Sequence, residues 1–188
     1  CNDGWPRSPS TPDKHDAWVI WLHGLGDQGS SWRHLELLVG SVIPWVKWSF
    51  PDAVPQSVTC KAGACVPAWF DIPELPVPLG QEIGIDGEAR TTTAALQEPI
   101  GLSAAVSMVH AMLAQAENLG YASDRIVLGG FSQGGALALL AGRLYERPLA
   151  GIVSFAGWQL RQQWRPSDAT GHVANLKTPI LLCHGTQD

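Results

Sequence analysis

Short apolar runs, separated by stretches with helical periodicity, constrain the fold of this 188-residue chain most strongly. The first run is Trp18 to Leu22 (WVIWL), which is rich in β-branched and aromatic residues and has no polar alternation. Such a run is typical of a strand buried on both faces of a mainly parallel sheet. Similar runs occur at residues 46–50, 125–128, 152–155 and 180–183. We therefore predict buried strands at all of these positions.

Two helical patterns lie between the predicted strands. Apolar residues spaced at i, i+4, i+7 and i+11 predict a helix over about residues 102–119, preceded by Pro99 and ended by Gly120. A second pattern predicts a helix over about residues 134–145. Strands that alternate with helices pair in parallel through right-handed crossovers. The predicted fold class is therefore α/β, a mainly parallel sheet with helices on both faces.

The domain organisation is simple. Residues 1–16 carry Pro, Ser and Asp without an apolar period and are predicted to form an irregular leader. Residues 17–188 form one predicted domain, because a chain of this length can bury a single substantial core. Within it, residues 73–97 show no period of either kind and read as a long loop. A loop this long is either a lid or binding loop, or an insertion.

Composition excludes several classes of protein. A net charge of -5 and a pI near 5.6 argue against a nucleic-acid partner. No apolar run reaches the roughly 18 residues that an integral membrane segment needs. Cys1, Cys60, Cys65 and Cys183 lack the spacing of a metal site, so we expect no metal. We expect reduced thiols in a cytoplasmic protein, although a Cys60–Cys65 disulfide stays open.

The clearest chemical motif is Gly130-Phe131-Ser132-Gln133-Gly134, which fits G-x-S-x-G between a predicted strand and a predicted helix. A nucleophile on a tight strand-to-helix turn needs neighbours without side chains. The turn also places Ser132 at a helix N-terminus, where backbone N–H groups favour developing negative charge. We predict that Ser132 is a catalytic nucleophile; the alternative is a serine that only caps the helix.

A glycine-rich turn, His23-Gly24-Leu25-Gly26-Asp27, follows the first predicted strand. An α/β-hydrolase supplies one oxyanion N–H from this position and the other from the residue after the nucleophile. We assign the two donors to the backbones of Leu25 and Gln133. Since both contribute main chain only, substituting either side chain is expected to matter less than displacing the turn.

The chain ends in His184-Gly185-Thr186-Gln187-Asp188, directly after an apolar run. An acid after a strand downstream of the serine fits the order Ser, Asp, His, so Asp188 is the predicted triad acid. The alternative is a solvated carboxylate. None of the six histidines fits the base. His172 and His184 both precede Asp188, His15 and His34 come too early in the chain, and His23 and His110 lie in the oxyanion turn and on the predicted helix. We interpret the chain as a fragment that stops before its catalytic histidine.

Four motifs in order resemble the acyl-protein thioesterase and lysophospholipase-carboxylesterase family of α/β-hydrolases. They span residues 19–32 (VIWLHGLGDQGSSW), 68–72 (AWFDI), 124–139 (DRIVLGGFSQGGALAL) and 184–188 (HGTQD). The resemblance implies hydrolysis of acyl thioesters or esters, such as palmitoylated cysteines or lysophospholipids, with no cofactor. It implies partners that are acylated proteins or lipid esters, met in transient contact with a membrane surface. It also implies that the chain lacks the last strand and helix of the fold.

The acyl-binding residues are less well defined. Trp69 and Phe70 either line the site or pack in the core. Trp158 stands in a turn, residues 157–160, that departs from the family's usual Leu-Pro ending, and the segment after Ile72 is longer than usual. These three aromatic residues are the candidate substrate contacts. The rival functions are a general carboxylesterase for short-chain esters and a non-catalytic, ligand-binding α/β-hydrolase.

Overall fold

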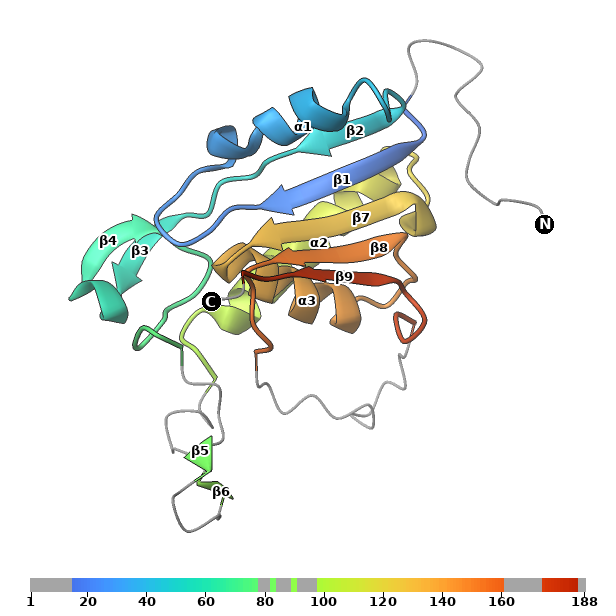
Figure 1. Cartoon of the computed structure of the whole chain (residues 1–188). Helices are drawn as coiled ribbons and strands as arrows, with labels where there is room; N and C mark the ends of the chain where they lie inside the picture. Colours follow the sequence, from blue (N-terminus) through green and yellow to red (C-terminus); the bar gives the residue numbers. More distant parts are fainter. Residues whose placement is uncertain (1–14, 78–81, 84–88, 91–97, 161–173, 186–188) are drawn as a thin grey trace.

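A parallel sheet forms the body of the molecule (Figure 1). The computed structural model describes residues 15–77, 82–83, 89–90, 98–160 and 174–185. Within them, five strands pair in parallel in the order β2-β1-β7-β8-β9. Their bounds are Val46–Ser49 for β2, Ala17–Leu22 for β1, Ile126–Phe131 for β7, Gly151–Phe155 for β8 and Ile180–Cys183 for β9. The predicted α/β class with a parallel sheet is confirmed.

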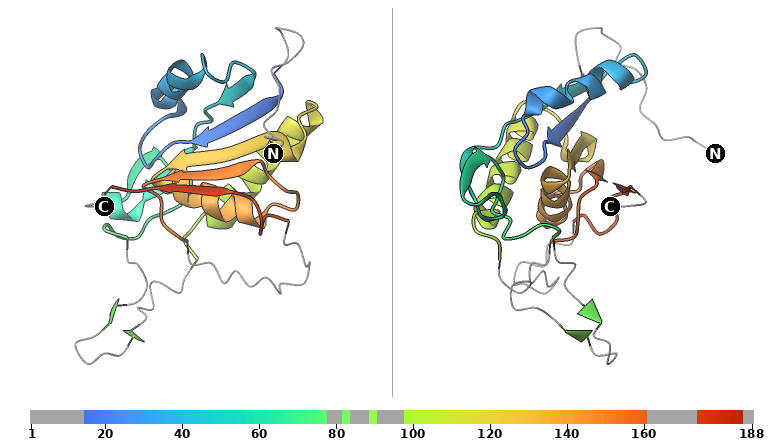
Figure 2. Two further views of the ribbon diagram at one scale, coloured as in Figure 1. Left: turned by 45° about the vertical axis from the view of Figure 1, so that its right-hand side comes forward. Right: turned by 60° about the vertical axis from the view of Figure 1, so that its left-hand side comes forward.

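The two long helices, α2 (Leu102–Asn118) and α3 (Gln133–Leu144), lie together on one side of the sheet (Figures 1 and 2). Ile152 and Ser154 of β8 point toward α3 and are buried, whereas Val153 between them is only half-buried. The short helix α1 (His34–Val39) follows the 3-10 turn η1 (Gly29–Trp32) and lies at the β2 end of the sheet. The hydrophobic core therefore fills the layer between the sheet and the two long helices.

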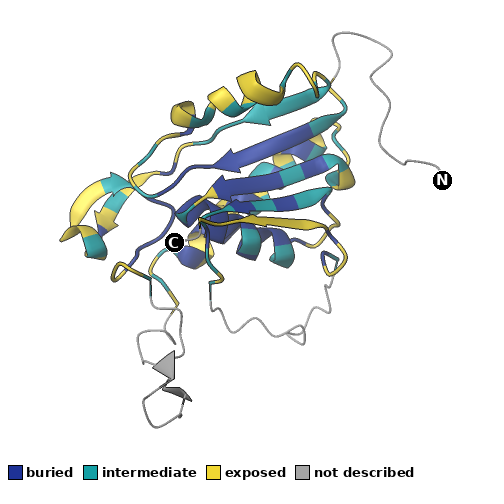
Figure 3. Ribbon diagram, viewed as in Figure 1, coloured by how far each residue is buried: buried dark blue, intermediate teal, exposed yellow. Residues whose placement is uncertain are grey.

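The strand β9 differs from its prediction. Its apolar run predicts burial on both faces, but Ile180, Leu181 and Leu182 keep 40%, 54% and 59% of their surface exposed. Figure 3 shows this strand as exposed along its length. The physical reason is its position, because in the described part of the chain β9 is an outer strand with β8 as its neighbour.

Two small antiparallel pairs lie outside the main sheet. In the first, β3 (Pro55–Val58) and β4 (Ala64–Pro67) are joined through the turn η2 (Thr59–Lys61). The second pairs β5 (Glu82–Ile83) with β6 (Ala89–Arg90), inside the stretch predicted as a loop. Strands of two residues are too short to show a period in sequence. The rest of residues 78–97, and residues 1–14 of the predicted leader, lie outside the described residues.

The chain before residue 73 and the chain after residue 97 meet at a neck formed by Asp71 and Ile100. The Asp71 N–H donates to the Ile100 carbonyl oxygen at 2.8 Å. The Asp71 carboxylate accepts hydrogen bonds from the Thr59 N–H and hydroxyl, each at 2.7 Å. The Cys60 N–H donates to the Ile72 carbonyl at 2.8 Å. Both ends of the stretch 73–97 are thus held beside the β3–β4 pair.

Asn175 cross-links the connection between α3 and β8. Its Nδ2 donates to the carbonyl oxygens of Tyr145 and Arg147, each at 2.9 Å. Its Oδ1 accepts from the Leu149 N–H at 2.8 Å and from the Thr178 hydroxyl at 2.7 Å. The residue is buried, so these four bonds satisfy an amide that water does not reach.

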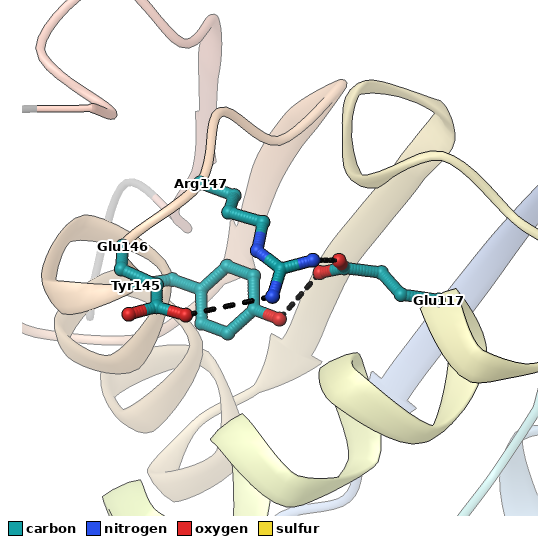
Figure 4. A network of polar contacts seen from close by, with 4 residues as sticks. All are labelled: Glu117, Tyr145, Glu146 and Arg147. Carbon is teal, nitrogen blue, oxygen red and sulfur yellow. Dashed lines mark hydrogen bonds and ion pairs between the residues drawn. The ribbon is translucent and has the colours of Figure 1, made fainter.

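A partly buried polar network joins the same connection to the end of α2 (Figure 4). The Tyr145 hydroxyl donates to the Glu117 carboxylate at 2.5 Å, and Arg147 forms an ion pair with the same carboxylate. Burial, and then the hydrogen bond to Glu117, raise the pKa of the Tyr145 phenol well above its ordinary value. The phenol therefore acts as a hydrogen-bond donor throughout the physiological range of pH.

Truncating Asn175 to alanine is expected to lower the free energy of unfolding by roughly 2 to 4 kcal/mol, because it leaves several buried backbone groups unpaired. Chemical denaturation of the complete protein measures this change. Asn118→Ala, at the exposed end of α2, is the matched control and should stay within about 0.5 kcal/mol of the wild type. Equal stability of the two variants would contradict the cross-linking role of Asn175.

Candidate active site

Ser132 occupies the turn between β7 and α3, with φ of 51° and ψ of -116°. A positive φ is strained for a residue with a side chain, and it is the geometry expected of a nucleophile on a strand-to-helix turn. Two backbone hydrogen bonds hold it. The Ser132 N–H donates to the Phe155 carbonyl at 2.8 Å, and its carbonyl accepts from the Ala136 N–H at 2.9 Å. The strand–turn–helix context that the motif requires is present.

The glycines of the motif lie where the backbone passes close to its neighbours. A Cβ on Gly134 would stand 2.5 Å from the His23 carbonyl oxygen, and still closer to that of Leu22. A Cβ on Gly130 would stand 2.5 Å from the carbonyl group of Gly134. Contacts this short exclude any side chain, so both positions need glycine for packing.

The turn after β1 lies beside Ser132. A Cβ on Gly24 would stand 3.5 Å from the Ser132 Cβ, and the Gly26 N–H donates to the Pro67 carbonyl at 2.8 Å. Across the described residues, neither the Leu25 N–H nor the Gln133 N–H donates to a protein acceptor. These two backbone donors thus have no protein acceptor among the described residues, and their role in an oxyanion hole stays a prediction.

The side chain of His23 supports this turn. Its Nε2 accepts a hydrogen bond from the Ala53 N–H at 2.9 Å, so the proton of the neutral ring lies on Nδ1. That Nδ1–H donates to the Gly24 carbonyl oxygen at 2.7 Å. The ring is fully buried and both of its nitrogens are engaged. His23 therefore braces the turn and has no free nitrogen to serve as a base.

The three predicted substrate contacts are placed differently from one another. Trp69 and Phe70 keep 4% and 1% of their surface exposed and belong to the hydrophobic core, in keeping with the packing alternative. Trp158 packs edge-on against Phe70 and lines an apolar cavity of about 380 Å³ beside α3. Ser132 does not line that cavity. A substrate contact of these residues stays a prediction.

The side chain of Gln133 makes contacts that the sequence does not indicate. Its carboxamide is fully buried and hydrogen-bonded at both ends to the 69–70 backbone. The sequence gives no signal for this pairing, because the partners lie 64 and 63 residues apart.

An aromatic group near the serine was also missed. Phe131, directly before Ser132, is 36% exposed and packs against Trp32 with 5.0 Å between the ring centroids. Trp32 in turn donates from its indole to the Asp27 carboxylate at 2.9 Å. Burial alone would raise the pKa of Asp27, but hydrogen bonds from Ser31, the Gln28 N–H and Trp32 lower it. Asp27 is therefore a charged anchor for the η1 turn.

The predicted acid, Asp188, lies outside the described residues, as does His172. The strand before Asp188 is placed, since the Ala156 N–H donates to the Cys183 carbonyl at 2.7 Å, just past β8. His184 follows and lies with its Nε2 2.5 Å from the Gly157 carbonyl oxygen. Because parallel strands end at one edge of a sheet, β9 ends at the edge where Ser132 lies.

Other site types leave no trace in the described ranges. Among these residues, no group of three or more His, Cys, Asp or Glu side chains could hold a metal ion. The helices they contain are too short or too polar to cross a membrane. Within the same residues Cys60, Cys65 and Cys183 are free thiols, so the Cys60–Cys65 disulfide left open by the sequence is not formed.

Residues 8–188 match the model of the phospholipase/carboxylesterase family. The chain is 36% identical over 173 residues to the probable carboxylesterase SOBER1-like of Arabidopsis thaliana, covering 92% of this chain and 60% of that protein. It is 34% identical over 176 residues to acyl-protein thioesterase 1 of Yarrowia lipolytica, covering 93% and 70%. The chain thus spans about three fifths of the length of the first of these relatives.

Solved structures agree. The crystal structure of Arabidopsis thaliana SOBER1 superposes with a TM-score of 0.70 at 32% identity, covering 92% of this chain and 75% of that one. The family match includes the four sequence motifs, the five strands of the main sheet and the turn that carries Ser132. The chain belongs to the phospholipase/carboxylesterase family of α/β-hydrolases.

Proposed function

We propose that the protein is a serine hydrolase that cleaves acyl thioesters or carboxylic esters. The observation that carries this proposal is the strained Ser132 turn, with the N–H groups of Leu25 and Gln133 beside it. A helix-capping serine needs no such strain and no facing glycine turn. Holding Ser132 at a positive φ costs conformational free energy. A nucleophile on this type of turn accepts that cost because the turn exposes its hydroxyl to a substrate.

The proposed reaction has two steps. The Ser132 Oγ adds to the acyl carbonyl carbon while a histidine, in a part of the protein outside this chain, takes its proton. The Leu25 and Gln133 N–H groups stabilise the resulting oxyanion. The intermediate then collapses as its bond to sulfur or oxygen breaks, and the leaving group takes the proton from the histidine and departs as a thiol or alcohol. Water, activated by the same histidine, hydrolyses the acyl-enzyme and restores the Ser132 hydroxyl.

We assign the acid to Asp188, which would hold the histidine in the tautomer that accepts the serine proton. The end of β9 at the sheet edge of Ser132, five residues before Asp188, supports the assignment. Among the described histidines, both ring nitrogens of His23 are engaged, and His34, His110 and His184 each have one ring nitrogen hydrogen-bonded to a backbone carbonyl.

The substrates we propose are palmitoylated proteins or lysophospholipids, in keeping with relatives named acyl-protein thioesterase. Such substrates would be met in transient contact with a membrane surface. We place the activity in the cytoplasm, where the free thiols of the described cysteines are usual.

Comparing acyl chain lengths tests this proposal. In the complete protein, kcat/KM for a palmitoyl thioester is expected to exceed that for the acetyl thioester by at least about tenfold. Each buried methylene is worth about 0.8 kcal/mol, so binding only two of them suffices. Steady-state rates on both substrates, below the concentration at which the long chain forms micelles, measure the ratio.

The outcomes separate the rivals. A preference for the acetyl substrate would identify a general short-chain carboxylesterase. Absence of turnover on either substrate, together with no labelling of Ser132 by a fluorophosphonate, would identify a binding protein and overturn the proposal. A variant lacking the Ser132 hydroxyl serves as the blank for both substrates.

A further inference from the structure

The carboxamide of Gln133 is a buried polar group that the proposed reaction does not use. Its Oε1 accepts a hydrogen bond from the Trp69 N–H at 3.0 Å, and its Nε2 donates to the Phe70 carbonyl at 2.6 Å. None of its surface is exposed to solvent. Burying an amide is unfavourable unless its donor and acceptor are both paired. The first residue of α3 is thereby tied to the backbone of residues 69 and 70.

Trp69 extends this tie to the turn that carries Leu25. Its indole Nε1 donates to the His23 carbonyl oxygen at 2.8 Å. Its ring packs on the His23 ring with 5.1 Å between the ring centroids. His23 in turn donates to the Gly24 carbonyl at 2.7 Å. A continuous set of hydrogen bonds therefore runs from the Gln133 side chain, through Trp69, to the residue before Leu25.

We propose that the Gln133 carboxamide and the Trp69 indole form a clamp that sets the position of the two oxyanion donors, the N–H groups of Gln133 and Leu25. Both side chains are buried, so they are positioning residues and do not touch the substrate. The inference rests on the proposed hydrolase function. Backbone donors stabilise an oxyanion only if they are held in place before it forms.

The clamp predicts a loss of transition-state binding without a loss of substrate binding. Gln133→Met keeps the length of the side chain and removes both hydrogen bonds. In the complete protein it is expected to lower kcat roughly ten- to a hundredfold with KM within about twofold, because small misplacements of donors have effects of that size. Trp69→Phe keeps an aromatic ring and removes one donor, and is expected to lower kcat about three- to tenfold.

A trifluoromethyl ketone analogue of the substrate supplies a readout that a merely structural role would not change. The Ser132 Oγ adds to its carbonyl, the histidine takes the proton, and the resulting hemiketal oxyanion occupies the position between the two donors. Its affinity is expected to fall by the same factor as kcat in each variant. The affinity of the corresponding amide, which binds without adding to the serine, is expected to stay unchanged.

Gln56 provides the matched control. Its Nε2 donates to the Ala68 carbonyl at 2.6 Å, so it bonds the same segment from the β3 strand without touching the nucleophile turn. Gln56→Met is expected to leave kcat and the affinity of the ketone unchanged.

The proposal is overturned if both clamp variants unfold cooperatively like the wild type and keep kcat and ketone affinity within about twofold. If Gln133→Met does not fold, Trp69→Phe decides by the same criterion. Failure of the hydrolase function itself looks different, because wild-type protein would then not react with a fluorophosphonate at Ser132. Normal labelling of the wild type with normal turnover of both variants rejects the clamp alone.

Discussion

Replacing Ser132 with alanine is expected to lower kcat of the complete protein by roughly 10⁶, the loss seen when the nucleophile of a serine protease is removed. Without the hydroxyl no acyl-enzyme forms, and only substrate binding and the oxyanion donors contribute to the remaining rate. The fold should survive, because the Ser132 N–H and carbonyl keep their bonds to Phe155 and Ala136. Ala156, at φ of 50°, shows that alanine is accommodated at positive φ in this protein.

Hydrolysis of a palmitoyl thioester and labelling by a fluorophosphonate measure the effect. Ser107→Ala, on the exposed side of α2, is the matched control and should change neither. Turnover by Ser132→Ala at the rate of the wild type would remove Ser132 from the reaction and with it the proposed mechanism.

Replacing Gly134 with alanine is expected to prevent stable folding, with a loss of at least about 3 kcal/mol in the free energy of unfolding. The added Cβ would stand 2.5 Å from the His23 carbonyl oxygen and nearer still to that of Leu22. Both obstacles are backbone atoms at the end of β1, so no side chain can rotate away. Either α3 moves off the sheet or β1 shifts, and each change disturbs the core.

Thermal unfolding of the soluble fraction, and the yield of soluble protein, measure this prediction. Gly151→Ala in β8 makes the same chemical change where the nearest atom, the Pro179 carbonyl oxygen, lies at an ordinary contact distance of 3.6 Å. That control should not lower the free energy of unfolding, since fixing alanine in a strand costs no more backbone entropy than fixing glycine. A Gly134→Ala protein as stable as this control would show that the close approach of α3 to β1 is not needed.

Much of the fold could be predicted because its signals are local. The apolar run at residues 18–22 and the spacing in residues 102–119 each reflect one element, and the structure places β1 and α2 there within about two residues of the predicted ends. The context of Ser132 could likewise be predicted, because the glycines that allow its turn are adjacent in sequence.

The remainder depends on contacts between distant residues. The Gln133 carboxamide meets Trp69 and Phe70 across more than sixty residues, and nothing in the motif indicates which way the side chain points. The exposure of β9 could not be predicted either. An apolar run indicates that a strand can be buried, but it does not indicate which neighbouring elements cover that strand. Asp188 stays a prediction because the described residues end before it.

The neck at Asp71 and Ile100 makes residues 73–97 a permissive place for change. The bonds that close it lie on the body of the molecule, so they form whatever number of residues intervenes. Doubling the length of a closed loop costs only about 0.6 kcal/mol in entropy. Over evolution this stretch can therefore grow, shrink or exchange its sequence while the Ser132 turn keeps its geometry. It is also the natural position at which to graft a foreign peptide or a reporter domain.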